Sequence, residues 1–182
     1  MTAARPRRAA VFFLPSPGLG RIVVESSAKW CFSEDIVHAE LPRFAGSEQH
    51  ALDEKGRLII PARFRERLGP VFVLTIAPPD PCLALYPSAT WVEFCERLEA
   101  VPQKDGRYRR FVRYLFAHTQ EVTADAQGRM VVPGLLRAYA GIERHVVSVG
   151  LLTRVEIWAQ ERYAFETPPE GEVPAFLSEL GL

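Results

Sequence analysis

The sequence lacks the residue clusters that mark most metalloproteins and disulfide-stabilised proteins. Its cysteines (Cys31, Cys82 and Cys95) are far apart and form no CxxC pair, and its four histidines form no group with metal-ligand spacing. An odd number of widely separated cysteines does not suit a disulfide framework. We therefore expect no metal, no other cofactor and reduced thiols in a cytoplasmic protein.

Long hydrophobic runs are also missing. No apolar stretch approaches the ~18 residues that a membrane-spanning helix needs. An apolar run near the N-terminus follows three arginines but ends at Pro15 after six residues, which is shorter than the ~7–15 residues of a signal peptide. The sequence therefore predicts neither a membrane partner nor secretion.

The chain also has no excess of positive or negative charge, because its 22 basic and 22 acidic residues cancel. Net charge thus neither indicates nor excludes a polyanionic partner, and the local placement of basic residues must decide. The chain has no nucleophile elbow, no P-loop and no glycine-rich dinucleotide loop. We expect it not to be an enzyme and to have no small-molecule substrate.

What the sequence does contain is a repeat. The stretch LDEKGRLIIP at 52–61 returns as ADAQGRMVVP at 124–133, so that equivalent residues lie 72 positions apart. A fixed offset of this kind indicates two copies of one small unit. Each copy has Asp and Gly at the first and fourth positions of a type I turn, followed by an apolar strand and a proline that suits a helix start. We interpret these residues as bracing the turns: Asp53, Gly56, Asp125 and Gly128.

The repeat continues downstream with the same order of elements. We expect a helix at 61–68, strands at 71–77 and 82–86, and a helix from about Pro87 in the first copy. The second copy should have a helix at 133–140 and strands at 145–150 and 154–159. A unit of about 45 residues is near the lower limit for an independent core. We therefore expect the copies to pack together in one pseudo-two-fold, β-rich arrangement.

The rest of the chain has no counterpart in the repeat. We divide the sequence into a poorly ordered extension at 1–41, a first unit at 42–89, linker helices at 90–118, a second unit at 119–164 and a tail at 165–182. The linker is the most basic segment, and its apolar residues at i, i+3, i+4 and i+7 predict an amphipathic helix within 102–118. The tail should be loose except for a short helix at 175–180.

The paired turn motifs and their flanks resemble the MraZ family, whose chains carry two SpoVT/AbrB-like units. The similarity covers about residues 43–165, including 43–46, 82–87 with Trp91, and 154–158. It implies an α+β fold in which the two tandem units form a pseudo-two-fold swapped-hairpin β-barrel with peripheral helices. Family chains begin near the residue that matches Phe44, so an overlong start-site assignment is one explanation of the extension.

The resemblance also implies a function. MraZ-like proteins are homo-oligomeric, ring-forming transcriptional regulators that bind double-stranded DNA at short direct repeats. Those repeats lie upstream of the division and cell-wall gene cluster, which includes the regulator's own gene. The resemblance therefore implies a cytoplasmic, nucleoid-associated protein. An antitoxin-type AbrB-like module, which binds a protein partner instead of DNA, is the alternative.

Basic residues of the turns are the candidate DNA contacts. Arginine's planar fork fits the O6 and N7 acceptors of guanine, and a narrow turn can enter the major groove. Arg57 and Arg129 occupy equivalent places, and the resemblance points to Arg57. Lys55 can reach a phosphate or a base, whereas its counterpart Gln127 is neutral, so the first copy should bind DNA more strongly. Two residues outside the turns complete the candidate set: Arg43 and Arg63.

Each basic group also has a structural interpretation. Arg57 and Arg129 could instead pair with Asp53 and Asp125 within the sheet. Arg63 could belong to a solvated helix face. For the basic linker helix, we favour pairing with acidic residues across a subunit boundary over contact with DNA.

Overall fold

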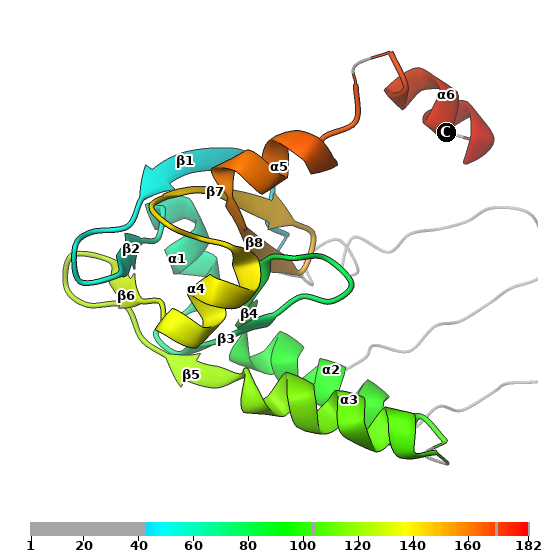
Figure 1. The fold of residues 1–182 in the computed structure, drawn as a ribbon, viewed down its shortest axis with the longest axis horizontal. Coiled ribbons are helices and arrows are strands. Elements are labelled where there is room, and N and C mark those ends of the chain that lie inside the picture. The colour runs from blue at the N-terminus through cyan, green and yellow to red at the C-terminus, as the bar shows by residue number, and fades with distance from the viewer. Residues whose placement is uncertain (1–42, 103–104, 170, 182) are drawn as a thin grey trace, which may run out of the picture. The chain divides into compact units, whose positions relative to one another are not determined.

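The computed structural model describes residues 43–102, 105–169 and 171–181 (Figure 1). The extension expected at 1–41 lies outside these residues. The described strands are β1 (Ser47–Ala51), β2 (Arg57–Ile59), β3 (Phe72–Ile76), β4 (Leu83–Pro87), β5 (Gln120–Val122), β6 (Arg129–Val131), β7 (His145–Leu151) and β8 (Arg154–Ala159). The described helices are α1 (Ala62–Leu68), α2 (Ser88–Ala100), α3 (Gly106–Ala117), α4 (Gly134–Ala140), α5 (Gln160–Glu166) and α6 (Val173–Glu179).

The strands of the two repeats form common sheets. A six-stranded antiparallel sheet has the order β1-β7-β8-β4-β3-β5, and β2 pairs with β6 in a separate two-stranded sheet. The first strand of each unit, β1 or β5, pairs with a strand of the other unit, β7 or β3. The two units therefore exchange strands, and neither one builds its own sheet.

The α+β class that the sequence predicts is confirmed, but the closed barrel is not found. Among the described residues the large sheet is open, with β1 and β5 as its two edge strands. The physical reason is that β2 and β6 bond to each other and do not bridge those edges. The architecture is therefore two antiparallel sheets with helices around them.

The main core is built from equivalent positions of the two units. Leu58 on β2 and Met130 on β6 are each 1% exposed, and Phe64 on α1 matches Leu136 on α4 in the same cluster. These residues come from the apolar triplets and the helices that follow the turns. Burying four such side chains against one another supplies a hydrophobic driving force that an isolated unit of this size would lack.

Strands β3 and β4 are buried along their whole length because helices and strands cover both of their faces. Leu74 and Leu85 belong to the main core, whereas Val73, Ala84 and Tyr86 form a second cluster on the opposite face. Trp91 of α2 packs on this second cluster. Burial on both faces explains why these strands have continuous apolar sequences instead of alternating ones.

Local sequence features explain where the helices outside the repeats begin. The amphipathic helix expected within 102–118 is present as α3, and it starts at Gly106 because the Asp105 side chain accepts hydrogen bonds from the backbone N–H groups of Arg107 and Tyr108. The tail helix, α6, begins at Val173 with Pro174 in its first turn. No helix in the described part of the chain is long and apolar enough to cross a membrane.

The chain crosses itself closely where the segment before β1 meets the end of β7. The Gly150 N–H donates to the Gly46 carbonyl at 2.8 Å, and the Phe44 N–H donates to the Leu152 carbonyl at 2.7 Å. A Cβ atom on Gly150 would lie 2.4 Å from the backbone nitrogen of Ala45. Glycine is required here because only a residue without a side chain lets the two backbones approach so closely.

We predict that Gly150→Ala destabilises the fold by about 1–3 kcal/mol, the usual penalty of an overpacked site. The added methyl group meets backbone, which must shift together with its hydrogen bonds. The matched control is Gly106→Ala, since a Cβ atom there has no neighbour within 4 Å. Urea unfolding measures both variants. An equal effect of the two substitutions would contradict this account of the crossing.

Candidate nucleic-acid interface

The two turn motifs are joined directly to each other. Strands β2 and β6 pair so that Arg57 lies opposite Val131 and Ile59 opposite Arg129. Beyond the strands, the Ile60 N–H donates to the Gly128 carbonyl and the Val132 N–H to the Gly56 carbonyl, each at 2.9 Å. The backbone that follows each turn and its strand is thus hydrogen-bonded to the glycine of the other turn. Because β2 and β6 are antiparallel and each strand follows its own turn, the two turns lie at opposite ends of this short strand pair.

An aspartate organises each turn through several hydrogen bonds. In the first turn, Oδ1 of Asp53 accepts from the backbone N–H groups of Lys55 and Arg57, each at 2.9 Å. In the second turn, Oδ1 of Asp125 accepts from the N–H groups of Gln127 and Arg129 at the same distance. Gly56 and Gly128 have φ values of 70° and 77°, a region that glycine adopts without the strain of a side chain.

The same aspartates hold the arginine side chains. Arg57 donates from Nε to Oδ2 of Asp53 at 2.7 Å. Arg129 contacts Oδ2 of Asp125 with two nitrogens, Nε at 2.9 Å and Nη2 at 2.7 Å. The structural pairing considered for these arginines is therefore present. Their side chains nevertheless stay 27% and 25% exposed, so pairing orients the guanidinium groups without burying them.

These contacts lower the pKa of both carboxyl groups. For Asp53, the largest cause is the hydrogen bond from the Arg57 backbone N–H, and the direction is downward from the ordinary value. For Asp125, the hydrogen bond from the Arg129 side chain leads, and the pKa falls to about 2. Both aspartates are therefore ionised at neutral pH and act only as acceptors.

A second pair of arginines covers the turns crosswise. Arg65 of α1 lies over the second turn, where a Cβ atom on Gly128 would be 1.7 Å from its Nη1. Arg137 of α4 lies over the first turn, where a Cβ atom on Gly56 would be 3.3 Å from its Cζ. The helix arginine of each unit thus lies over the turn glycine of the other unit. Four guanidinium groups therefore surround the paired turns.

Reasoning from the sequence missed Arg65 and Arg137 as site residues. The signal was their identity at equivalent positions, 72 residues apart. On the helix surface each looked like an ordinary solvated arginine. Only the exchange of strands between the units places each one over the opposite turn.

The remaining predicted residues lie partly at the turns and partly away from them. Lys55 and Gln127 are exposed at the first and second turns. Arg63 is held beside β1, where its Nε contacts Glu48 at 3.0 Å and its Nη2 donates to the Ser47 carbonyl at 3.1 Å. Arg43 is exposed, and its carbonyl accepts a hydrogen bond from Arg67. These contacts of Arg43 and Arg63 do not involve the turns.

The chain matches known proteins over most of the described residues. The family described as "MraZ protein, putative antitoxin-like" matches residues 43–114 and 115–165. A "Transcriptional regulator MraZ" of Moorella thermoacetica is 46% identical over 135 residues, which cover 72% of this chain and 94% of the relative. Proteins with the same name from Clostridium acetobutylicum and Pelotomaculum thermopropionicum are 41% identical over 142 residues (76% of this chain, 99% of the relative) and 47% over 120 (66% and 82%).

We predict that Asp125→Asn makes the stability of the protein less sensitive to acid. Because the pKa of Asp125 is lowered from 3.8 to about 2 in the folded state, its charge stabilises the fold fully above about pH 4, and this contribution is lost as the pH falls toward about 2. Asparagine can still accept from the backbone but cannot titrate. Urea midpoints measured between these pH values should fall less steeply for the variant, and equal slopes would contradict the prediction.

Proposed function

The chain belongs to the MraZ family, and from this premise we propose that it is a sequence-specific, DNA-binding transcriptional regulator that contacts the duplex with its paired turns. The family is one of transcriptional regulators and not of enzymes. The observation that carries the proposal is the pair of adjacent, partly exposed arginines that aspartates hold in equivalent orientations. A pre-oriented guanidinium loses less side-chain freedom when it binds a base edge.

The two arginines are not equivalent as DNA contacts. Arg57 contacts its aspartate through Nε alone, which leaves both Nη groups for the O6 and N7 acceptors of a guanine. Arg129 uses Nε and Nη2 for Asp125, so fewer donors remain. Lys55 adds a positive charge to the first turn, where the second has Gln127. Both differences favour the first turn as the stronger contact.

Flanking basic groups supply contacts to phosphates in this proposal. Arg65 and Arg137 lie beside the turns, and their charge adds to the local positive potential that attracts a duplex. Arg43 and Arg63 are further candidates. Arg63 should contribute less, because Glu48 already neutralises much of its charge. Phosphate contacts position the protein, whereas the turn arginines read bases.

Assembly is the second part of the proposal. A chain with no net charge and few basic groups at its site binds DNA weakly as a single copy. A homo-oligomeric ring presents several pairs of turns to short direct repeats, and linkage raises the effective concentration of each further contact. Repeats spaced by about 10 base pairs would place the contacts on one face of the duplex.

The finer parts of the proposal follow the family resemblance. We place the direct repeats upstream of the division and cell-wall gene cluster, including the protein's own gene, and the protein in the cytoplasm on the nucleoid. We interpret the exchange of strands between the units as the swapped-hairpin arrangement of SpoVT/AbrB-like proteins. DNase footprinting on the region upstream of the coding sequence tests the location of the sites.

An antitoxin-type interaction module is the second candidate, because the description of the matching family contains the term antitoxin-like. Such a module would capture a toxin in a fixed stoichiometry without DNA. Affinity purification after nuclease treatment distinguishes the two candidates. Recovery of one stoichiometric partner, together with no binding to upstream DNA, would favour the module.

We predict that Arg57→Ala weakens binding to upstream DNA by roughly tenfold to a hundredfold, the usual range for a lost bidentate base contact. The matched control is Arg97→Ala, which removes the same charge from an exposed position on α2. Fluorescence anisotropy gives the affinities, and circular dichroism checks that both variants are folded. A folded Arg57→Ala protein that binds as tightly as the parent would refute the site assignment.

We also predict opposite effects for exchanging the residues at the third turn position. Lys55→Gln should weaken binding, and it should reduce the slope of log K against log salt by about one for each copy that contacts the duplex. Gln127→Lys should strengthen binding and steepen the slope. Anisotropy titrations at several salt concentrations measure both. Unchanged slopes would show that these positions do not face phosphates.

A further inference from the structure

The C-terminal helix α6 has an uncovered apolar face. Val173, Phe176, Leu177 and Leu180 follow the i, i+3, i+4, i+7 pattern, and their exposed fractions are 41%, 59%, 42% and 57%. A helix of seven residues is too short to be stable by itself in water, because helices below ~12–15 residues are marginal without packing. We therefore expect this apolar face to pack on a complementary apolar surface.

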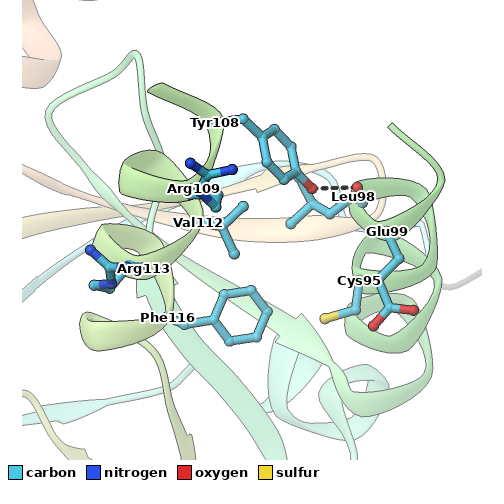
Figure 2. Close-up of a pocket in the computed structure, with 8 residues that line it drawn as sticks. All are labelled: Cys95, Leu98, Glu99, Tyr108, Arg109, Val112, Arg113 and Phe116. Atoms are coloured by element: carbon cyan, nitrogen blue, oxygen red, sulfur yellow. Dashed lines mark hydrogen bonds between the residues drawn. The ribbon is translucent and has the colours of Figure 1, made fainter. Parts of the chain in front are cut away.

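A groove of matching character lies between α2 and α3. It has a volume of about 350 Å³, and Figure 2 shows Leu98 on one helix and Val112 and Phe116 on the other. The Tyr108 hydroxyl donates to the Leu98 carbonyl and ties the two helices together. Phe116 is 45% exposed. The groove is thus apolar, open and formed on a fixed helix pair.

The net charges of the two surfaces are opposite. Helix α3 contains four arginines and no acidic residue, and two of them, Arg109 and Arg113, line the groove, where Glu99 of α2 is the acidic residue. Neither one forms an ion pair in the described part of the chain. The sequence after Tyr163 contains no lysine, arginine or histidine, and it has four glutamates: Glu166, Glu170, Glu172 and Glu179. Electrostatic attraction therefore favours this segment as the occupant of the groove.

We propose that α6 of one copy docks into the α2–α3 groove of a second copy. Phe176 and Leu177 pack on the apolar residues of the groove, and Glu172 and Glu179 lie beside Arg109 and Arg113. The occupant comes from a second copy because residues 43–102, 105–169 and 171–181 of a single chain leave both the helix face and the groove uncovered. An amphipathic helix seated in an apolar groove is a common mode of recognition.

This contact gives assembly a direction. Helix and groove are different surfaces, so each copy uses its helix on one neighbour and offers its groove to another. Such heterologous contacts generate a closed ring when the rotation between copies permits closure. The inference rests on the self-assembly part of the proposed function and assigns that assembly to a segment beyond residue 165, where the family match ends.

A disulfide cross-link tests the proposal, since Cys95 lines the groove and Cys82 is buried. Leu177→Cys is introduced together with Cys31→Ser, and the protein is oxidised in air with copper phenanthroline. We expect covalent multimers on a non-reducing gel. Adding Cys95→Ser should abolish them. Ala175→Cys, on the opposite side of α6, is the matched control and should give none. Absence of multimers, or a cross-link within a single chain, would overturn the proposal.

Charge reversal tests the same contact in solution. Arg109→Glu with Arg113→Glu should raise the concentration at which the oligomer dissociates by at least about tenfold, because like charges then face each other. Glu172→Arg with Glu179→Arg should restore assembly in that background. Arg110→Glu lies on α3 outside the groove and should have no effect. Light scattering over a dilution series measures all variants. An equal effect of Arg110→Glu, or no rescue, would overturn the assigned contact.

The two levels of the proposal can fail separately. If the parent protein is monomeric at all concentrations, the assembly part of the proposed function fails and the docking contact fails with it. If the parent is oligomeric but the Leu177→Cys variant forms no multimers through Cys95, the docking contact alone fails. In the Leu177→Cys background, Arg57→Ala should weaken DNA binding and still form the covalent multimers, which separates the DNA contact from assembly.

Discussion

The structure depends on the backbone pairing of β2 with β6. Through it, the chain leaving each turn satisfies the carbonyl of the other turn's glycine, between Ile60 and Gly128 and between Val132 and Gly56. Those bonds hold each turn against the end of the strand that follows the other turn, and the pairing brings Leu58 and Met130 into one core. Without this pairing, each unit would have an exposed apolar strand and unpaired backbone groups. The same backbone pairing therefore stabilises the fold and positions the residues of the candidate site.

The aspartates connect the stability of the turns to the orientation of the arginines. One oxygen of each carboxylate satisfies backbone donors and the other holds a guanidinium group. Structural pairing and DNA contact are consequently compatible roles for Arg57 and Arg129. A partly exposed ion pair adds little to stability, so the main effect of the pairing is geometric. It restricts the side chain that meets a base edge in our proposal.

Surfaces outside the paired turns suit contact between copies. Helix α3 combines an apolar stripe with four arginines, while the acidic tail provides the opposite charge and an apolar helix face. The proposed site for DNA and the proposed surface for self-association are thus built on separate elements. In our proposal, this separation lets several weak DNA contacts act together without requiring a strongly basic chain.

The sequence by itself determined the repeat, the turn residues and the amphipathic helix, whereas the α+β class followed from the family resemblance. These features depend on interactions over a few residues: an aspartate bonding its own turn, a glycine at positive φ, an apolar period. Only the tertiary structure decided that β1 and β5 pair across the units, that the large sheet stays open and that Arg65 and Arg137 cover the opposite turns. Those contacts join residues that are far apart along the chain, and they depend on which apolar surfaces bury each other, which no local pattern encodes.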